Sequence, residues 1–142
     1  MSTSSPSGNG TAAERMGLKP GMIVMEIGYD DDVDDGLRGQ IEDATGEELV
    51  DEGTDEVVDV VLIWHRDGDG DLTDVLVDAI APLADSGFIW LLSPKRGRAG
   101  YVEPSDIAEA ASIAGLSQTS LTTAAEWSAA RLVGRKSAGG KR

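Results

Sequence analysis

Cysteine is absent from this sequence, and aromatic residues are few. Without a cysteine among its 142 residues, the chain forms no disulfide bond, no thiolate zinc site and no cysteine nucleophile. Aromatic side chains make up only 4% of the residues, whereas hydrophobic side chains make up 40%. We therefore expect an aliphatic core, and this length suits one domain rather than two.

Long hydrophobic runs are also missing. No apolar run approaches the roughly 18 residues that a membrane helix needs. The N-terminal stretch MSTSSPSGNGT has no basic segment followed by an apolar one, which is the pattern of an export signal. We therefore expect a cytoplasmic protein without a membrane partner.

Positive charge is scarce and unevenly placed. The net charge is −14, and the stretch from Glu26 to Asp78 contains only two basic residues, Arg38 and Arg66, whereas most of the lysines and arginines follow Ser93. Phosphates would be repelled by this field, so duplex nucleic acid is not an expected partner. We interpret the charge as belonging to solvated faces that keep the protein soluble.

Glycine, proline and serine clusters divide the chain into elements. Residues 1–11 and 137–142 are expected to be disordered tails, the second one basic, around a single domain at residues 12–136. Helices are expected over residues 11–17, 30–46, 72–86 and 103–115. Strands are expected over residues 22–28, 48–52, 56–66, 88–95, 116–123 and 126–136.

This alternation of strands and helices predicts the fold class. Right-handed βαβ units give a mostly parallel sheet covered by helices on both faces, which is a three-layer α/β sandwich. Residues 56–66 are rich in β-branched side chains, so they are expected to form a central strand that is buried on both faces. The short spacing of the last two strands predicts an antiparallel C-terminal pair.

The segment HRDGDGDLTDVLVD contains the sole histidine and a run of aspartates. Asp67, Asp69 and Asp71 are spaced almost as in a calcium loop, but Leu72 stands where that loop needs glycine. We interpret the run as a strand-to-helix turn that caps a helix, and we assign no metal site. No serine has a nucleophile-elbow pattern around it, so His65 is assigned no catalytic role. It is placed with Asp67 at the strand end where α/β sheets bind ligands.

The segment SPKRGRAGYVEP is the main cationic feature of the expected domain. Lys95, Arg96 and Arg98 follow a strand in a glycine-bearing loop. Such a loop is suited to bind a phosphate or carboxylate, and it is equally suited to neutralise acidic loops at neighbouring strand ends. The three tryptophans are expected to pack in the core or at the sheet ends.

With these elements in place, the chain resembles class I methyltransferases. MIVMEIGYD resembles the first strand and the acid-x-Gly-x-Gly cofactor loop, and ELVDE sits where the strand with the ribose-binding acid belongs. EVVDVVLIW resembles the fourth strand, and the last two segments resemble the antiparallel closing pair. The resemblance implies a Rossmann-like scaffold and, in a working enzyme, S-adenosylmethionine held by Glu26, Gly28 and Asp51.

The cofactor loop departs from the methyltransferase pattern at Asp30. The second glycine of that pattern lets the backbone approach the cofactor, but here Asp30 is followed by two further aspartates. The stretch before EVVDVV also leaves little room for the usual intervening strand, helix and strand. We interpret EIGYD as a degenerate cofactor loop, which disfavours S-adenosylmethionine as a cofactor.

More narrowly, the chain is similar to domain-of-unknown-function family 3052, which is best known in actinobacteria. This resemblance is carried by the segments GLKPGMIVMEIGYDDDVDD, IEDATGEELVDE, VVLIWHRDGDGDLTDVLVDAIAPLAD, SPKRGRAGYVEPSDIAEAA and EWSAARLV. It implies the fold class and a bacterial cytoplasmic setting, without an assigned activity.

Three functional hypotheses follow. The first is a non-catalytic binding or regulatory module whose partner is a protein or a small anionic ligand, and the alternatives are a small methyltransferase and a nucleotide or phosphate sensor. The first places its binding edge at the strand ends, and the residues predicted for this edge or for the cofactor are Glu26, Gly28, Asp30, Asp51, His65, Asp67, Lys95, Arg96 and Arg98.

Overall fold

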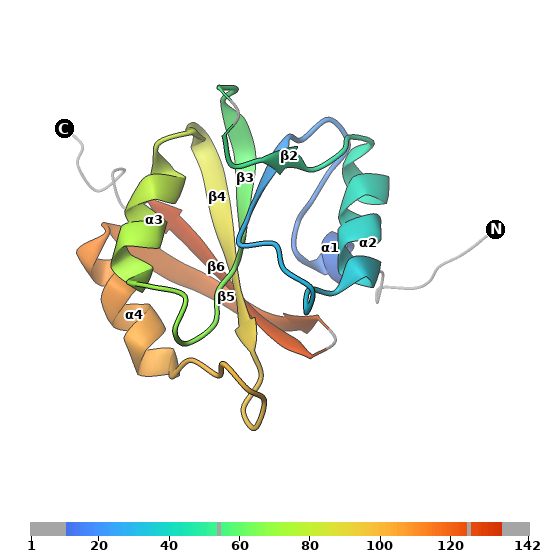
Figure 1. Cartoon of the computed structure of the whole chain (residues 1–142). Coiled ribbons are helices and arrows are strands. Elements are labelled where there is room, and N and C mark those ends of the chain that lie inside the picture. The colour runs from blue at the N-terminus through green and yellow to red at the C-terminus, as the bar shows by residue number, and fades with distance from the viewer. Residues whose placement is uncertain (1–10, 54, 125, 135–142) are drawn as a thin grey trace.

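Six strands form one mixed sheet in the computed structural model, which describes residues 11–53, 55–124 and 126–134 (Figure 1). Their order across the sheet is β2-β1-β3-β4-β6-β5. The strands are β1 (Val24–Ile27), β2 (Val50–Asp51), β3 (Val58–Trp64), β4 (Leu83–Pro94), β5 (Leu116–Ala124) and β6 (Trp127–Gly134).

The directions of the strands confirm the predicted fold class. β1 pairs in parallel with β2 and β3, and β3 pairs in parallel with β4. β6 runs antiparallel between β4 and β5, so the C-terminal hairpin extends the parallel part of the sheet. The predicted mostly parallel sheet with an antiparallel C-terminal pair is therefore correct.

Helices cover both faces of this sheet. The helices are α1 (Ala12–Arg15), α2 (Asp35–Thr45), α3 (Leu72–Ile80) and α4 (Pro104–Ile113). α1 and α2 lie on one face, and α3 and α4 lie on the other (Figure 1). The three-layer arrangement was predicted from the alternation of elements.

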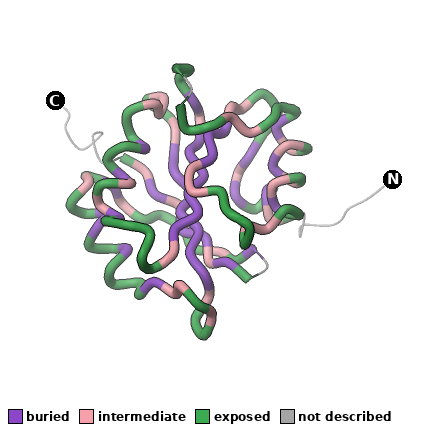
Figure 2. The backbone as a smooth tube through the Cα atoms, in the orientation of Figure 1, coloured by how far each residue is buried: buried purple, intermediate pink, exposed green. Residues whose placement is uncertain are grey.

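Side chains of β3 divide between two hydrophobic cores. Val61 and Ile63 pack with the residues of α3 and α4, whereas Leu62 and Trp64 pack with those of α1 and α2. Every one of these residues is at most 1% exposed. The buried segments follow the strands through the middle of the molecule (Figure 2). The prediction that this strand is central and buried on both faces is confirmed.

The three tryptophans are core residues, as expected. Trp64, Trp90 and Trp127 are each 1% exposed. The rings of Trp64 and Trp127 meet edge to face with centroids 4.9 Å apart. The indole N–H of Trp90 donates to the carbonyl oxygen of Met16 at 2.8 Å, which fixes the chain after α1 against β4.

Two helix boundaries differ from the sequence-based expectation. α3 ends at Ile80 rather than near residue 86, because Pro82 has no backbone N–H to donate a helical hydrogen bond. Gly87 therefore lies inside β4, where an added Cβ would come within 2.6 Å of the Asp59 carbonyl oxygen. α2 begins at Asp35 rather than near residue 30, because the Asp34 side chain accepts from Leu37 N–H at 2.9 Å and caps the helix there.

The expected tails fall on residues outside the described part of the chain, apart from Thr11. Thr11 is exposed and caps α1 by accepting a hydrogen bond from Glu14 N–H. Within the described ranges, no helix is long and apolar enough to cross a membrane.

Candidate functional site

The carboxyl ends of the parallel strands β1, β2, β3 and β4 meet at one edge of the sheet. All residues predicted for a binding site lie in these strand ends or in the loops that follow them. Most of them nevertheless divide between a crevice at β1 and β3, a shallow acidic area beside β2, and a cavity beyond β4, whereas Asp67 and Arg98 line none of the three.

Glu26, the acid predicted to hold a cofactor, is buried and fully engaged by the protein. Its carboxylate accepts two hydrogen bonds from the Arg38 guanidinium, at 2.7 and 3.0 Å, and one from the Trp64 indole N–H at 2.8 Å. The hydrogen bond to Glu26 raises the pKa of Arg38, which also stacks over the Tyr29 ring. Glu26 thus ties α2 and β3 to β1.

Gly28 brings the end of β1 against β3. Its φ is +84°, a conformation that side chains rarely adopt, and an added Cβ would lie 2.3 Å from the Trp64 carbonyl oxygen. The glycine is therefore needed for packing between two parts of the chain itself. Asp30 follows on an exposed turn, where its Oδ1 accepts from Asp31 N–H at 2.7 Å.

Arg66 lies in the crevice between the ends of β1 and β3. Its Nη1 donates to the carbonyl oxygens of Gly28 at 2.9 Å and Trp64 at 3.1 Å, and also to Asp69. Its Nε and Nη2 donate to the two carboxylate oxygens of Asp32. Only 13% of the Arg66 side chain is exposed. This pairing raises the pKa of Arg66 and lowers that of Asp32.

The remaining crevice has a volume of about 290 Å³. His65 lines it and is 5% exposed, and burial lowers the pKa of this imidazole. Its backbone N–H donates to the Leu92 carbonyl oxygen at 2.8 Å and so holds β3 to β4. The side chain of Asp67 is exposed, and its backbone N–H donates to the Gly100 carbonyl oxygen.

The other acids of this edge have structural positions. Asp51 ends β2 next to Glu26 and is exposed, in a shallow acidic area that also includes Glu52. Asp71 caps α3 by accepting from Thr73 N–H at 2.8 Å, as the turn interpretation predicted. Asp69 accepts from the Arg66 backbone N–H at 3.0 Å. Among the described residues, no cluster of three acids or histidines has a geometry that holds a metal ion.

The basic loop after β4 divides its three cations. Arg98 turns toward the β5–β6 hairpin, where its Nη1 donates to the Glu126 carbonyl oxygen at 3.1 Å. Arg96 lies over the Tyr101 ring, 5.2 Å from its centroid. No carboxylate of the described chain lies within 4.0 Å of the charged groups of Lys95 or Arg96.

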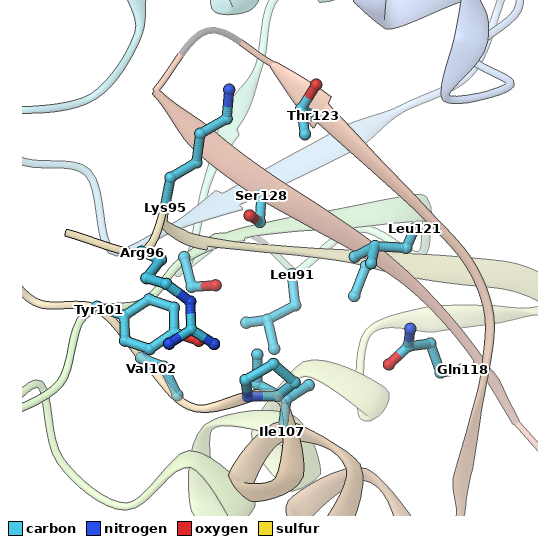
Figure 3. Close-up of a pocket in the computed structure, with 13 residues that line it drawn as sticks. Leu91, Lys95, Arg96, Tyr101, Val102, Ile107, Gln118, Leu121, Thr123 and Ser128 are labelled. Atoms are coloured by element: carbon cyan, nitrogen blue, oxygen red, sulfur yellow. The ribbon is translucent and has the colours of Figure 1, made fainter. Parts of the chain in front are cut away.

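Lys95 and Arg96 border a separate cavity of about 430 Å³ on the α4 side of the sheet (Figure 3). The other residues that line it are Leu91, Ser93, Tyr101, Val102, Pro104, Ile107, Gln118, Leu121, Thr123, Ser128 and Ala130.

The comparisons agree with the narrower resemblance. Residues 13–136 match the model of a family described as "Protein of unknown function (DUF3052)". This chain belongs to the DUF3052 family. It is 55% identical over 130 residues to uncharacterised proteins of Mycobacterium tuberculosis and Mycobacterium bovis, and each match covers 92% of this chain and 82% of the relative.

Solved structures show that the DUF3052 chain has a methyltransferase-like fold. A putative methyltransferase from Thermoplasma acidophilum aligns with a TM-score of 0.60 and 9% identity, over 84% of this chain and 71% of that one. A TehB-like S-adenosylmethionine-dependent methyltransferase from Corynebacterium glutamicum aligns with a TM-score of 0.52 and 13% identity, over 87% and 85% of the two chains. At such identities the likeness establishes the fold alone.

Arg38 and Arg66 of this DUF3052 chain were not among the residues predicted for the site. The available signal was their isolation, because they are the only basic residues in the stretch from Glu26 to Asp78. In the structure each of them pairs with an acidic residue near the end of β1. Arg38 pairs with Glu26, and Arg66 pairs with Asp32. The hydroxyl groups of Ser93, Thr123 and Ser128, which line the cavity, were also not predicted.

Proposed function

We propose that this DUF3052 protein is a non-catalytic binding or regulatory module on a methyltransferase-like scaffold, working in the bacterial cytoplasm. The observation that carries the proposal is the position of Arg66. Its guanidinium lies where an α/β sheet offers space to a ligand, between the ends of two neighbouring strands. There it is hydrogen-bonded to the end of β3, to Gly28 directly after β1, and to Asp32 in the loop between β1 and α2.

This arrangement opposes binding of S-adenosylmethionine in the crevice. Moving Arg66 aside would leave the Asp32 carboxylate and the Gly28 carbonyl oxygen without their hydrogen-bond donor. The free energy of binding would have to offset the loss of these hydrogen bonds. Glu26 has both carboxylate oxygens occupied by Arg38, so it has little capacity left for a cofactor. Asp30 adds a side chain and a negative charge where the methyltransferase pattern has glycine.

The edge that stays open to a partner is the loop after β4. Among the described residues, no carboxylate pairs with Lys95 or Arg96, although the chain has a net charge of −14. Two cations that no described carboxylate neutralises, in so acidic a chain, favour a small anionic ligand or an acidic protein surface over a purely structural turn.

The proposal is tested by calorimetric titration of the purified protein with S-adenosylmethionine and with S-adenosylhomocysteine. We expect no saturable heat up to millimolar ligand, while the TehB-like enzyme of Corynebacterium glutamicum serves as the positive control. A dissociation constant in the micromolar range would overturn the proposal and favour the methyltransferase alternative. In a double variant, Arg66→Ser with Asp32→Ser, a gain of S-adenosylmethionine binding would show that this pair blocks the crevice in the native chain.

A further inference from the structure

The floor of the 430 Å³ cavity consists of cross-strand rows. Ser93 of β4 pairs with Ser128 of β6, which pairs in turn with Thr123 of β5. Residues directly opposite each other in neighbouring strands project to the same face of a sheet. The three hydroxyl groups therefore form one transverse row, next to Lys95 at the end of β4.

The adjacent row along the same strands is apolar. Leu91, Ala130 and Leu121 are paired across β4, β6 and β5 in the same way, two residues further from the basic loop. Val102 and Ile107 face them from the loop and helix α4 (Figure 3). The cavity thus changes from hydroxyl groups and cations at one end to hydrocarbon at the other.

Ser93 supplies an independent sign that a ligand belongs here. It is only 3% exposed, and its hydroxyl has no hydrogen-bond partner among the described residues. Buried polar groups are almost always satisfied, because an unmade hydrogen bond costs about 1–3 kcal/mol. A hydroxyl that lines a cavity without a protein partner is suited to donate to a ligand.

The charge of the lining is opposite to that of the chain. Among the described residues that line the cavity, Lys95 and Arg96 are charged and none is an aspartate or glutamate, although acidic residues outnumber basic ones by 26 to 12 in the sequence. The Tyr101 ring holds the Arg96 guanidinium from one side, which leaves its edge free to form paired hydrogen bonds to a carboxylate.

We propose that this cavity binds a small amphipathic carboxylate. The cavity is a separate site from the crevice between β1 and β3 that Arg66 occupies. The carboxylate accepts hydrogen bonds from the Ser93 hydroxyl and from Lys95 and Arg96, and the hydrocarbon body lies along Leu91, Ala130 and Leu121. The volume is in the lower part of the range of about 300–1,000 Å³ for small-molecule pockets. Nucleotides fit the lining less well, because few polar groups lie beyond the hydroxyl row to satisfy a base and a sugar.

The test uses decanoate as the probe, with decanol, inorganic phosphate and ATP as comparisons in calorimetric titrations. We expect saturable binding of decanoate, about tenfold weaker binding of decanol because it lacks the charge, and no binding of the two phosphates. Equal binding of decanol and decanoate would reduce the site to an apolar cavity. Binding of phosphate or ATP without decanoate would make it a phosphate site, and both outcomes overturn the proposal, as does the absence of all binding.

Variants place the probe in the cavity. Lys95→Ala and Arg96→Ala should each weaken decanoate binding about tenfold, whereas Lys19→Ala, an exposed cation elsewhere, should leave it unchanged. Ser93→Ala should weaken binding without lowering the stability of the free protein, because the lost hydroxyl has no hydrogen-bond partner among the described residues. Ser86→Ala, on the exposed part of the same strand, is its control.

The outcome is separable from that of the proposed function. If neither decanoate nor S-adenosylmethionine binds, the proposed function is retained and the proposal of a carboxylate site in the cavity is wrong. Conversely, S-adenosylmethionine binding that leaves the decanoate affinity unchanged would overturn the proposed function alone.

Discussion

Arg66 and Asp32 are paired end to end across the mouth of the β1–β3 crevice, through two hydrogen bonds between the guanidinium fork and the carboxylate. Paired bonds of this type fix the orientation of both groups. The Asp32 side chain is 43% exposed, whereas that of Arg66 is 13% exposed, so the arginine carries the greater desolvation cost. The pair therefore depends on the two carbonyl oxygens that Arg66 also binds.

Replacement of Arg66 by alanine should destabilise the fold by about 1–3 kcal/mol, because two carbonyl oxygens and a carboxylate lose their shared donor. The measurement is urea unfolding followed by circular dichroism, with Lys19→Ala as the matched loss of an exposed cation. A change no larger than that of Lys19→Ala would mean that water replaces Arg66 in the crevice and that the crevice is open.

Acid should remove the contribution of the same pair. The pKa of Asp32 is held below 3.8 in the folded state, chiefly by its hydrogen bond from Arg66. A carboxyl with a depressed folded-state pKa stabilises the fold above its unfolded pKa, and the contribution is lost as the pH falls through the folded value. Urea unfolding between pH 5 and about pH 2 should therefore show a smaller loss of stability for Arg66→Ala than for the native chain. Parallel pH profiles for the two proteins would contradict this assignment.

Histidine titration gives a third prediction. Burial lowers the pKa of His65 below 6.5, so the unfolded state takes up a proton at a higher pH than the folded state does. The free energy of unfolding is therefore not reduced by His65 above pH 6.5, where the ring is neutral in both states. It decreases as the pH falls from 6.5 toward the pKa of His65 in the folded state. His65 is the only histidine, so its ring resonances in an NMR titration report this value without assignment. A midpoint at or above 6.5 would contradict a pKa that is lowered chiefly by burial.

Local patterns predicted the strands and the fold class because burial on two faces leaves a direct sign in the sequence. The β-branched run around Val58–Trp64 is central, and the glycine and acids after Ile27 do mark a strand end. The end of α3 was predicted too late because the apolar spacing continued to Leu83, whereas Pro82 ended the helix. Backbone chemistry at one residue outweighed a periodic pattern there.

The contacts that define the two candidate sites depend on pairings between distant segments. Arg66 reaches Asp32 across 34 positions, and it does so only because β1 and β3 are neighbours in register. The hydroxyl row likewise requires β6 to lie between β4 and β5, since Ser93 and Thr123 are not adjacent strand partners. Sequence spacing contains neither fact, so the basic loop was predicted and the cavity behind it was not.

A pair of glycine variants separates backbone strain from steric contact at the β1 end. Gly28 and Gly21 have nearly the same φ, +84° and +89°, but an added Cβ meets the Trp64 carbonyl oxygen at 2.3 Å in the first and nothing within 4 Å in the second. Gly21→Ala should therefore cost only the left-handed conformation, about 1–2 kcal/mol. Gly28→Ala should cost at least about 1 kcal/mol more, because the end of β1 must move away from β3. Urea unfolding of both variants measures the difference. Equal losses would show that β1 can shift at little cost, and the crevice that Arg66 occupies could then widen enough to admit a ligand.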